Sequence, residues 1–159
     1  MDTVKVRNVI IGKGRPKICV PIVAVTREEI LEAAGGFCHL SADLVEWRAD
    51  WYEDVADLSK VLETAGMLRE KLGEIPLLFT FRTLKEGGEK SLETEEYTAL
   101  NRAVAESGSV DLLDIELFTG EDEVVSLIGH AHEHQVKVIV SSHDFRKTPS
   151  RETIIGRMK

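Results

Sequence analysis

The sequence has few cysteines and no long hydrophobic run. Its only two cysteines, Cys19 and Cys38, lack the CxxC spacing of zinc sites and redox motifs, so we expect free thiols and no disulfide framework. No apolar stretch approaches the roughly 20 residues of a membrane helix. The N-terminus, MDTVKVRN, is charged from its second residue, unlike a signal peptide. These absences predict a cytoplasmic protein that makes no membrane contact.

Positive charge is also scarce. The 20 lysines and arginines are outnumbered by 28 aspartates and glutamates, which gives a net charge of -8, and no Lys/Arg-rich run occurs. Because binding of nucleic acid or anionic lipid requires a basic surface, both kinds of partner are disfavoured. With 43% hydrophobic residues, a chain of 159 residues can bury a core of ordinary size. We therefore expect one domain over residues 1–159.

Short apolar runs alternate with segments of helical periodicity along the chain. The apolar runs are typical of buried strands and cover Ile18–Ala24, Leu44–Trp47, Pro76–Phe81, Val110–Ile115 and Val136–Ser141. The helical segments cover Arg27–Ala34, Val55–Leu72, Glu93–Ser107 and Glu121–Gln135, with a further start at Arg151. Near-continuous apolar strands separated by helices indicate a parallel α/β sheet covered by helices.

Local signals refine these boundaries. Thr26, Thr119 and Ser150 each precede early carboxylates, so we expect each hydroxyl to cap a helix at its positive end. Before the first strand, Val4–Val6 and Val9–Ile11 predict a short β-hairpin within residues 1–14. The hairpin is expected to lie outside the β/α units, which occupy residues 18–159.

The repeat length is compatible with two α/β folds. The repeat runs at about 25 to 35 residues, so eight units would need close to the roughly 250 residues of a (β/α)8 barrel, and this chain contains five such units. A five-stranded, flavodoxin-like open sheet fits the length without truncation, and it predicts mixed strand order with one ligand crevice. The positions of the polar residues favour the barrel.

Ionisable side chains follow four successive strands, and in a barrel such strand ends form the active-site rim. They are Glu46, Arg48 and Asp50, then Arg82 and Glu86, then Asp114 and Glu116, then Ser142, His143 and Asp144. Any one of them could simply cap the next helix. In EWRAD, however, three charges recur at period two and are expected to share a strand face that points into the barrel. Inward charges need partners or a ligand.

Several ordered segments together resemble the type I 3-dehydroquinate dehydratases of the shikimate pathway. They are EWRAD at 46–50, FTFR at 79–82 with KEGGE at 85–89, DIEL at 114–117, and SSHDF at 141–145 with TP at 148–149. The resemblance implies a (β/α)8 TIM barrel, truncated here after about five units, with an N-terminal hairpin across its base and often a homodimer. It also implies a lyase that converts 3-dehydroquinate to 3-dehydroshikimate in chorismate biosynthesis, with no metal and no organic cofactor.

The resemblance assigns roles to five residues. His143 matches the general base that removes the C2 proton and then protonates the departing C1 hydroxyl in a syn elimination, a task that suits an imidazole. Glu86 matches the carboxylate that orients this histidine. Glu46, Arg48 and Arg82 match residues that bind the hydroxyls and carboxylate of the substrate, for which a guanidinium is a bidentate partner.

One functional residue of the family has no match. The family forms an imine between a lysine on the sixth strand and the C3 ketone, whereas this sequence ends at Lys159, a helical surface position. Lys137 is expected on the rim opposite His143 and Lys85 in a solvated loop, so neither is expected to substitute. The family's later carboxylate-binding arginine would also lie beyond residue 159.

We therefore expect the chain alone to be inactive and, with bare strand edges, prone to aggregate unless another segment or copy completes the barrel. Two other interpretations stay open. One is a non-catalytic product that retains anion-binding residues. The other is the flavodoxin-like binding domain, in which Glu46, Arg82 and His143 should fail to converge.

A histidine-rich segment, GHAHEHQ, carries a weaker signal. His130 and His134 are expected on one helix face at spacing i, i+4, but the order lacks the H-E-x-x-H pattern. We interpret the segment as a solvated helix end, where histidine is favourable against the helix dipole, and predict no metal site. Gly87 and Gly88 are interpreted as a turn and not as a phosphate loop.

Overall fold

The computed structural model describes residues 3–37 and 40–158. A five-stranded parallel sheet forms its centre, preceded by a two-stranded antiparallel hairpin. The parallel strands are β3 (Cys19–Ile22), β4 (Leu44–Arg48), β5 (Leu77–Thr80), β6 (Leu112–Glu116) and β7 (Lys137–Ser141). Cys19 is a free thiol, as expected. The expectations for Cys38 and Lys159 fall outside the described residues.

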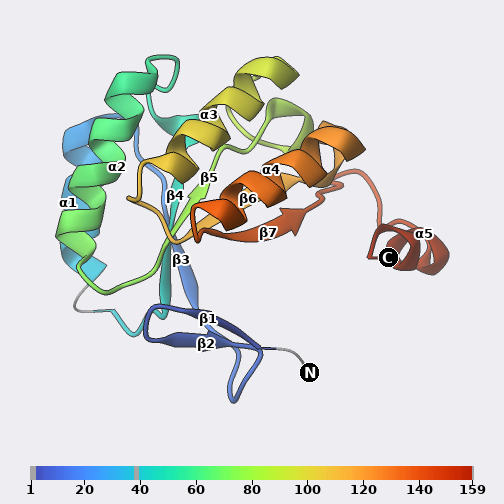
Figure 1. The fold of residues 1–159 in the computed structure, drawn as a ribbon, viewed down its shortest axis with the longest axis horizontal. Coiled ribbons are helices and arrows are strands. Elements are labelled where there is room, and N and C mark those ends of the chain that lie inside the picture. Colours follow the sequence, from blue (N-terminus) through green and yellow to red (C-terminus); the bar gives the residue numbers. More distant parts are fainter. Residues whose placement is uncertain (1–2, 38–39, 159) are drawn as a thin grey trace.

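Strand order separates the two candidate folds. Each strand pairs in parallel with the next strand of the chain, in the order β3-β4-β5-β6-β7. This sequential order is that of a (β/α)8 barrel. Figure 1 shows that the sheet is twisted, so that its strands fan out. A flavodoxin-like sheet reverses its order next to the first strand. The barrel prediction is confirmed, and the flavodoxin-like alternative is wrong.

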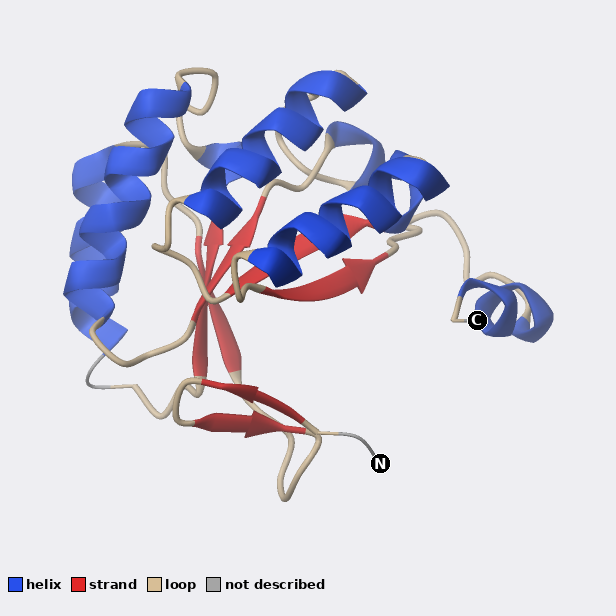
Figure 2. Cartoon of the chain, viewed as in Figure 1, coloured by secondary structure: helices blue, strands red, loops and turns tan. Residues whose placement is uncertain are grey.

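Four helices cover the outer face of the sheet, each packed beside the next (Figure 2). They are α1 (Arg27–Gly36), α2 (Leu58–Leu72), α3 (Thr94–Glu106) and α4 (Glu121–Glu133). Helix α5 (Arg151–Arg157) follows β7 and lies apart from them (Figure 1). Short 3-10 helices follow three of the strands: η2 (Ala49–Trp51), η3 (Leu84–Glu86) and η4 (Leu117–Thr119). Within the described ranges, no helix has the length and apolar character to cross a membrane.

The predicted helix caps are correct at two positions and wrong at one. The Thr26 hydroxyl accepts a hydrogen bond from the Glu29 N–H, and the Glu29 carboxylate accepts one in return, which makes a capping box at α1. Ser150 caps α5. Thr119 does not cap α4, because Gly120 takes the N-cap position without a side-chain bond. The positive φ of Gly120, 137°, turns the chain directly from η4 into the helix.

The sheet has one apolar face and one mixed face. On β4, Val45 and Trp47 are fully buried beneath the helices, whereas the alternating Glu46 and Arg48 are only half-buried. The strand ends at Arg48, so Asp50 lies in η2 and not on the strand face. The period-two prediction therefore holds for Glu46 and Arg48 and is corrected for Asp50.

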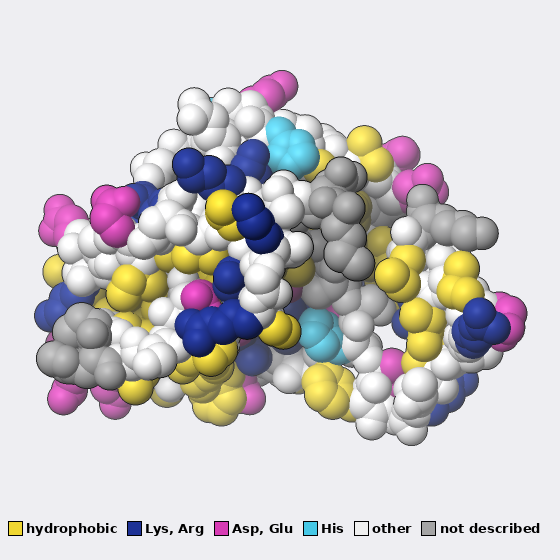
Figure 3. Space-filling model, turned by 90° about the horizontal axis from the view of Figure 1, so that it is seen from below, with side chains coloured by type: hydrophobic (Ala, Val, Ile, Leu, Met, Phe, Trp, Pro, Cys, Tyr) yellow, Lys and Arg dark blue, Asp and Glu magenta, His cyan; other side chains and the backbone are white. Residues whose placement is uncertain are grey.

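The hairpin of β1 (Val4–Val6) and β2 (Val9–Ile11) covers the N-terminal end of the sheet (Figure 1). Val6 packs in a second apolar cluster with residues of three parallel strands, namely Leu44, Leu78 and Leu112. The view from below shows further hydrophobic side chains on this side of the molecule (Figure 3). The mixed face is thus apolar where the strands begin.

Asp111 anchors the hairpin to the domain. Its Oδ1 lies 2.6 Å from Arg7 Nε, and its Oδ2 lies 2.7 Å from Arg69 in α2 and accepts a hydrogen bond from the Leu77 N–H at 2.9 Å. Arg7 has a positive φ of 50°, which is unfavourable for a residue with a side chain. The ion pair with Asp111 therefore holds the hairpin turn in place.

We expect Asp111→Ala to lower the free energy of unfolding by about 3 kcal/mol, because it leaves the Arg69 guanidinium buried without its charged partner. The side chain of Arg69 is only 14% exposed. Urea denaturation of the purified protein measures this loss. The matched control is Glu74→Ala, since Glu74 also pairs with Arg7 but is 82% exposed and should have no measurable effect. Equal stability of the two variants would contradict the anchoring role.

Candidate active site

The C-terminal ends of β4 to β7 bring the predicted site residues to one rim of the sheet. The strands are parallel and pair in register, with Glu116 of β6 opposite Ser141 of β7. The segments that follow each strand therefore lie side by side at the same edge. Buried ionisable groups gather there, namely Asp50, Arg82, Glu86, Asp114 and Glu116.

His143 and Glu86 form a direct pair. Glu86 Oε2 lies 3.0 Å from His143 Nδ1 and accepts a hydrogen bond from the His143 backbone N–H at 2.9 Å. The side chain of Glu86 is only 7% exposed, whereas that of His143 is 38% exposed. A carboxylate at Nδ1 favours the tautomer with its proton on Nδ1. Nε2 is then the basic nitrogen, on an imidazole that solvent or substrate can reach.

A tight loop after β5 places Glu86 beneath His143. Glu86 ends η3, and Gly87 turns the chain with a φ of 87°. At Gly88 an added Cβ would lie 1.8 Å from the Arg82 carbonyl oxygen, so only glycine fits. The backbone N–H groups of Glu86 and Gly88 both donate to the Thr83 carbonyl. The interpretation of these glycines as a turn is confirmed.

Phe145 continues the site on the other side of the histidine. Its ring is stacked with that of His143, with an interplanar angle of 11° and ring centroids 6.3 Å apart. The ring also covers Gly87, where a Cβ would lie 2.3 Å from it, yet Phe145 is 77% exposed. Phe145 was not among the residues expected at the site from the sequence. The only signal was its place in SSHDF, two residues after the histidine.

Arg82 lies at the centre of the carboxylate cluster. Its guanidinium is 2.9 Å from Asp114, 3.0 Å from Glu116 and 3.8 Å from Glu86, and it donates to Ser141 Oγ at 2.9 Å. Burial alone would lower the pKa of Arg82, but the carboxylates of Asp114 and Glu116 outweigh it and raise the pKa above its usual value. Arg82 is therefore a permanent buried cation that joins β5 to β6 and β7.

A second ion pair extends the cluster to β4. Arg48 binds Asp50 through two parallel hydrogen bonds of 2.8 Å, and the bond to Asp50 raises the pKa of Arg48. Asp50 in turn accepts hydrogen bonds from the backbone N–H groups of Arg82 and Glu89. Glu46 precedes Arg48 by two residues on the same strand face. The five predicted site residues thus lie on β4 and in the segments that follow β5 and β7.

Hydrogen bonds behind the rim hold Glu116 in position. Its carboxylate accepts from the Thr83 N–H at 2.9 Å and from the Thr83 hydroxyl at 2.7 Å. Its backbone N–H donates to the Tyr97 hydroxyl at 3.1 Å, and burial raises the pKa of Tyr97. Glu116 was expected at the rim, but Thr83 and Tyr97 were not singled out, because an uncharged hydroxyl beside Arg82 or within α3 gives no local signal of its partner.

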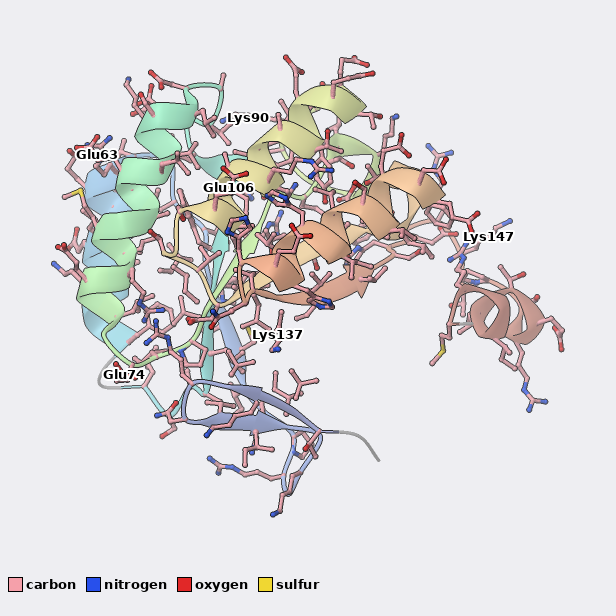
Figure 4. The ribbon with its side chains drawn as sticks, viewed as in Figure 1. Glu63, Glu74, Lys90, Glu106, Lys137 and Lys147 are labelled. Atoms are coloured by element: carbon pink, nitrogen blue, oxygen red, sulfur yellow. The ribbon has the colours of Figure 1, made fainter. Side chains whose placement is uncertain are left out.

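The lysines considered from sequence lie as expected. Lys137 begins β7, at the end of the sheet away from His143, and Figure 4 shows it on the side opposite Lys147. Lys85 is exposed within η3. A cavity of about 610 Å³ between β7 and α5 is lined by Ser142, Asp144 and other residues but not by His143. The charged rim, and not this cavity, is where a base and its orienting carboxylate meet.

Comparison with known proteins agrees with this geometry. The family model described as type I 3-dehydroquinase matches residues 18–159. The 3-dehydroquinate dehydratase of Salmonella agona (strain SL483) is 48% identical over all 159 residues, and that of Salmonella enteritidis is equally similar. The chain spans 63% of the length of these curated relatives.

Two solved structures are similar over nearly the whole chain. The type I 3-dehydroquinate dehydratase of Clostridium difficile, described with covalently modified comenic acid, has a TM-score of 0.95 and 44% identity, and the match covers 98% of this chain and 61% of that one. The 3-dehydroquinate dehydratase of Enterococcus faecalis has a TM-score of 0.93 and 50% identity, with 96% and 64% covered. With a family model that matches most of its length, the chain belongs to the type I 3-dehydroquinase family.

Proposed function

We propose that the protein to which this chain belongs dehydrates 3-dehydroquinate to 3-dehydroshikimate. The observation that carries the proposal is the His143–Glu86 pair at the rim of a barrel sheet, at 3.0 Å, in a member of this family. A half-exposed imidazole oriented by a buried carboxylate is suited to move a proton on a bound substrate. The identity of the proposed substrate is taken from the family to which the chain belongs.

The proposed reaction begins with an imine. A lysine amine condenses with the C3 ketone and releases water, and His143 then removes a C2 proton to give an enamine. As the enamine collapses, the C1 hydroxyl leaves as water with the proton that His143 carries. Hydrolysis of the imine then frees the enone product. By resemblance to the family, this lysine belongs to the strand that follows β7 in full-length relatives.

We further propose that Glu46, Arg48 and Arg82 bind the substrate's hydroxyls and carboxylate. Glu46 and Arg48 are half-buried and reach the rim, whereas Arg82 is already engaged by Asp114 and Glu116. Arg82 would therefore donate to the substrate through an N–H group that it also directs to Asp114 or Glu116. The rim formed by β4 to β7 has more carboxylates than guanidiniums, so an anionic substrate needs further positive charge. In the family, a later arginine and the imine lysine supply it.

The location, oligomeric state and partners of the enzyme are inferred from the same family resemblance. We infer a cytoplasmic enzyme that acts, as a homodimer, on a small molecule and not on nucleic acid. The net charge of -8 supports this inference, because it disfavours polyanionic partners. The remaining alternative is a non-catalytic product that keeps the anion-binding residues.

Imine trapping tests the proposed mechanism. The full-length protein, incubated with 3-dehydroquinate and reduced with borohydride, should gain the mass of one reduced substrate adduct on a single lysine, measured by intact-protein and peptide mass spectrometry. The 159-residue chain, treated identically, is the matched comparison and should remain unmodified. An adduct on Lys85 or Lys137 would contradict the proposed origin of the imine. No adduct on the full-length protein would contradict the proposed mechanism.

His143→Ala should lower kcat of the full-length enzyme by about 10²- to 10⁴-fold, the usual contribution of a general acid–base group. The rise of the enone product, followed by ultraviolet absorbance, measures the rate. His132→Ala is the matched control, because His132 is an exposed histidine on α4. Equal rates for the two variants would remove His143 from the reaction.

Glu86→Gln should lower kcat while KM changes little. A glutamine amide can donate to Nδ1 and thereby stabilise the tautomer whose Nε2 carries the proton, which cannot act as a base. The kinetic constants of the full-length enzyme measure the effect. Glu95→Gln alters an exposed carboxylate in the first turn of α3 and should leave kcat unchanged. An unchanged kcat in Glu86→Gln would show that the carboxylate does not orient the base.

A further inference from the structure

Three potential metal ligands meet at the C-terminal ends of α3 and α4, away from the rim. Glu106 is the last residue of α3, His130 lies in the last turn of α4, and His134 is the C-cap of α4. Figure 4 shows Glu106 at the end of α3 that lies beside α4. Since both helices lead into strands, this cluster lies at the end of the sheet opposite His143.

The ligand atoms are close together. His130 Nε2 lies 3.0 Å from Glu106 Oε1, and one ligand atom from each of the three residues lies within 4.8 Å of the others. The two imidazole rings have centroids 4.8 Å apart and planes inclined by 47°. In a tetrahedral site with metal–ligand distances of about 2.0–2.1 Å, ligand atoms are about 3.3 Å apart. The His130–Glu106 separation is close to that spacing, and metal binding requires the exposed His134 to complete the set.

His130 Nε2 is shielded from solvent and is unsatisfied. Although it is close to the Glu106 carboxylate, the two atoms are not aligned for a hydrogen bond, and this nitrogen has no hydrogen-bond partner among the described residues. A shielded polar atom without a partner is uncommon in folded proteins. An imidazole nitrogen and a carboxylate oxygen that lie 3.0 Å apart without a hydrogen bond are spaced as two ligands of one cation would be.

The backbone and the local charge both favour a cation. The His134 N–H donates to the carbonyls of His130 and Ala131, which fixes His134 one turn after His130 on the same helix face. Gln135 then has a φ of 64° and leads the chain into β7. The C-terminal ends of α3 and α4, with their partial negative charge, lie beside the Glu106 carboxylate.

We propose that Glu106, His130 and His134 form a site for a divalent transition-metal ion, with Zn²⁺ as the expected occupant. Two imidazoles and one carboxylate suit zinc and its neighbours in the Irving–Williams series, whereas Mg²⁺ and Ca²⁺ require a shell of oxygen ligands. Glu106 and His134 are exposed, so water completes the coordination. The site joins α3 to α4 from outside and is independent of the proposed dehydratase reaction.

Calorimetric titration of the full-length protein with ZnCl₂, without any affinity tag, tests the proposal. We expect one Zn²⁺ per chain and a rise in Tm that EDTA reverses, because an ion that binds only the folded state stabilises it. MgCl₂ should produce neither effect. His134→Ala should weaken Zn²⁺ binding at least tenfold, and since this side chain is exposed, the variant should keep the Tm of the metal-free chain.

Two variants decide whether these three residues are the ligands. His132→Ala removes a histidine from the same segment but outside the cluster, and it should bind Zn²⁺ as tightly as the parent chain. Glu106→Gln keeps the size of the side chain but removes its charge, and it should also weaken binding at least tenfold. The absence of stoichiometric Zn²⁺ binding would overturn the proposal. So would equal losses in His132→Ala and His134→Ala, or unchanged affinity in Glu106→Gln.

Discussion

The buried guanidinium of Arg82 is the interaction on which the rest of the rim depends. A charge that leaves water is tolerated in a protein only when charged and hydrogen-bonding partners surround it. Arg82 meets this requirement with Asp114 and Glu116 from β6, Ser141 from β7 and Glu86 from its own loop. Because these partners come from separate segments, the contacts of this one guanidinium hold the C-terminal ends of β5, β6 and β7 together. The same guanidinium lies 3.8 Å from Glu86 and helps to hold this carboxylate beside His143.

The same sheet is apolar at one end and charged at the other. Where the strands begin, Leu44, Leu78 and Leu112 pack beneath Val6 of the hairpin, and no charge has to be neutralised. Where they end, ion pairs occupy the equivalent positions of the same face. Because apolar packing and the Asp111 anchor secure the first end, the second end can carry closely spaced charges that would destabilise an isolated sheet. Stability and the chemistry of the rim are therefore separated along the strands.

Sequence patterns predicted what depends on periodicity and local chemistry. The strands, the helices, the barrel order and the helix cap at Thr26 all follow from such patterns, and so do the rim positions of Arg82, Glu86 and His143. They failed where the outcome depends on a turn or on a distant partner. Gly120 and not Thr119 occupies the N-cap position of α4, and η2 takes Asp50 off the strand face. Thr83 and Tyr97 support Glu116 through contacts between segments that no local pattern connects.

The histidine segment shows why a distant partner changes an interpretation. Read along α4 alone, His130 and His134 are well explained by the dipole of a helix end. That explanation leaves the shielded His130 Nε2 without a hydrogen bond, and it does not account for the Glu106 carboxylate 3.0 Å away, which arrives from α3. The β/α repeat brings the ends of successive helices together as regularly as it brings together the ends of successive strands. A barrel therefore offers a second place where ligands from separate segments converge, at the end opposite its rim.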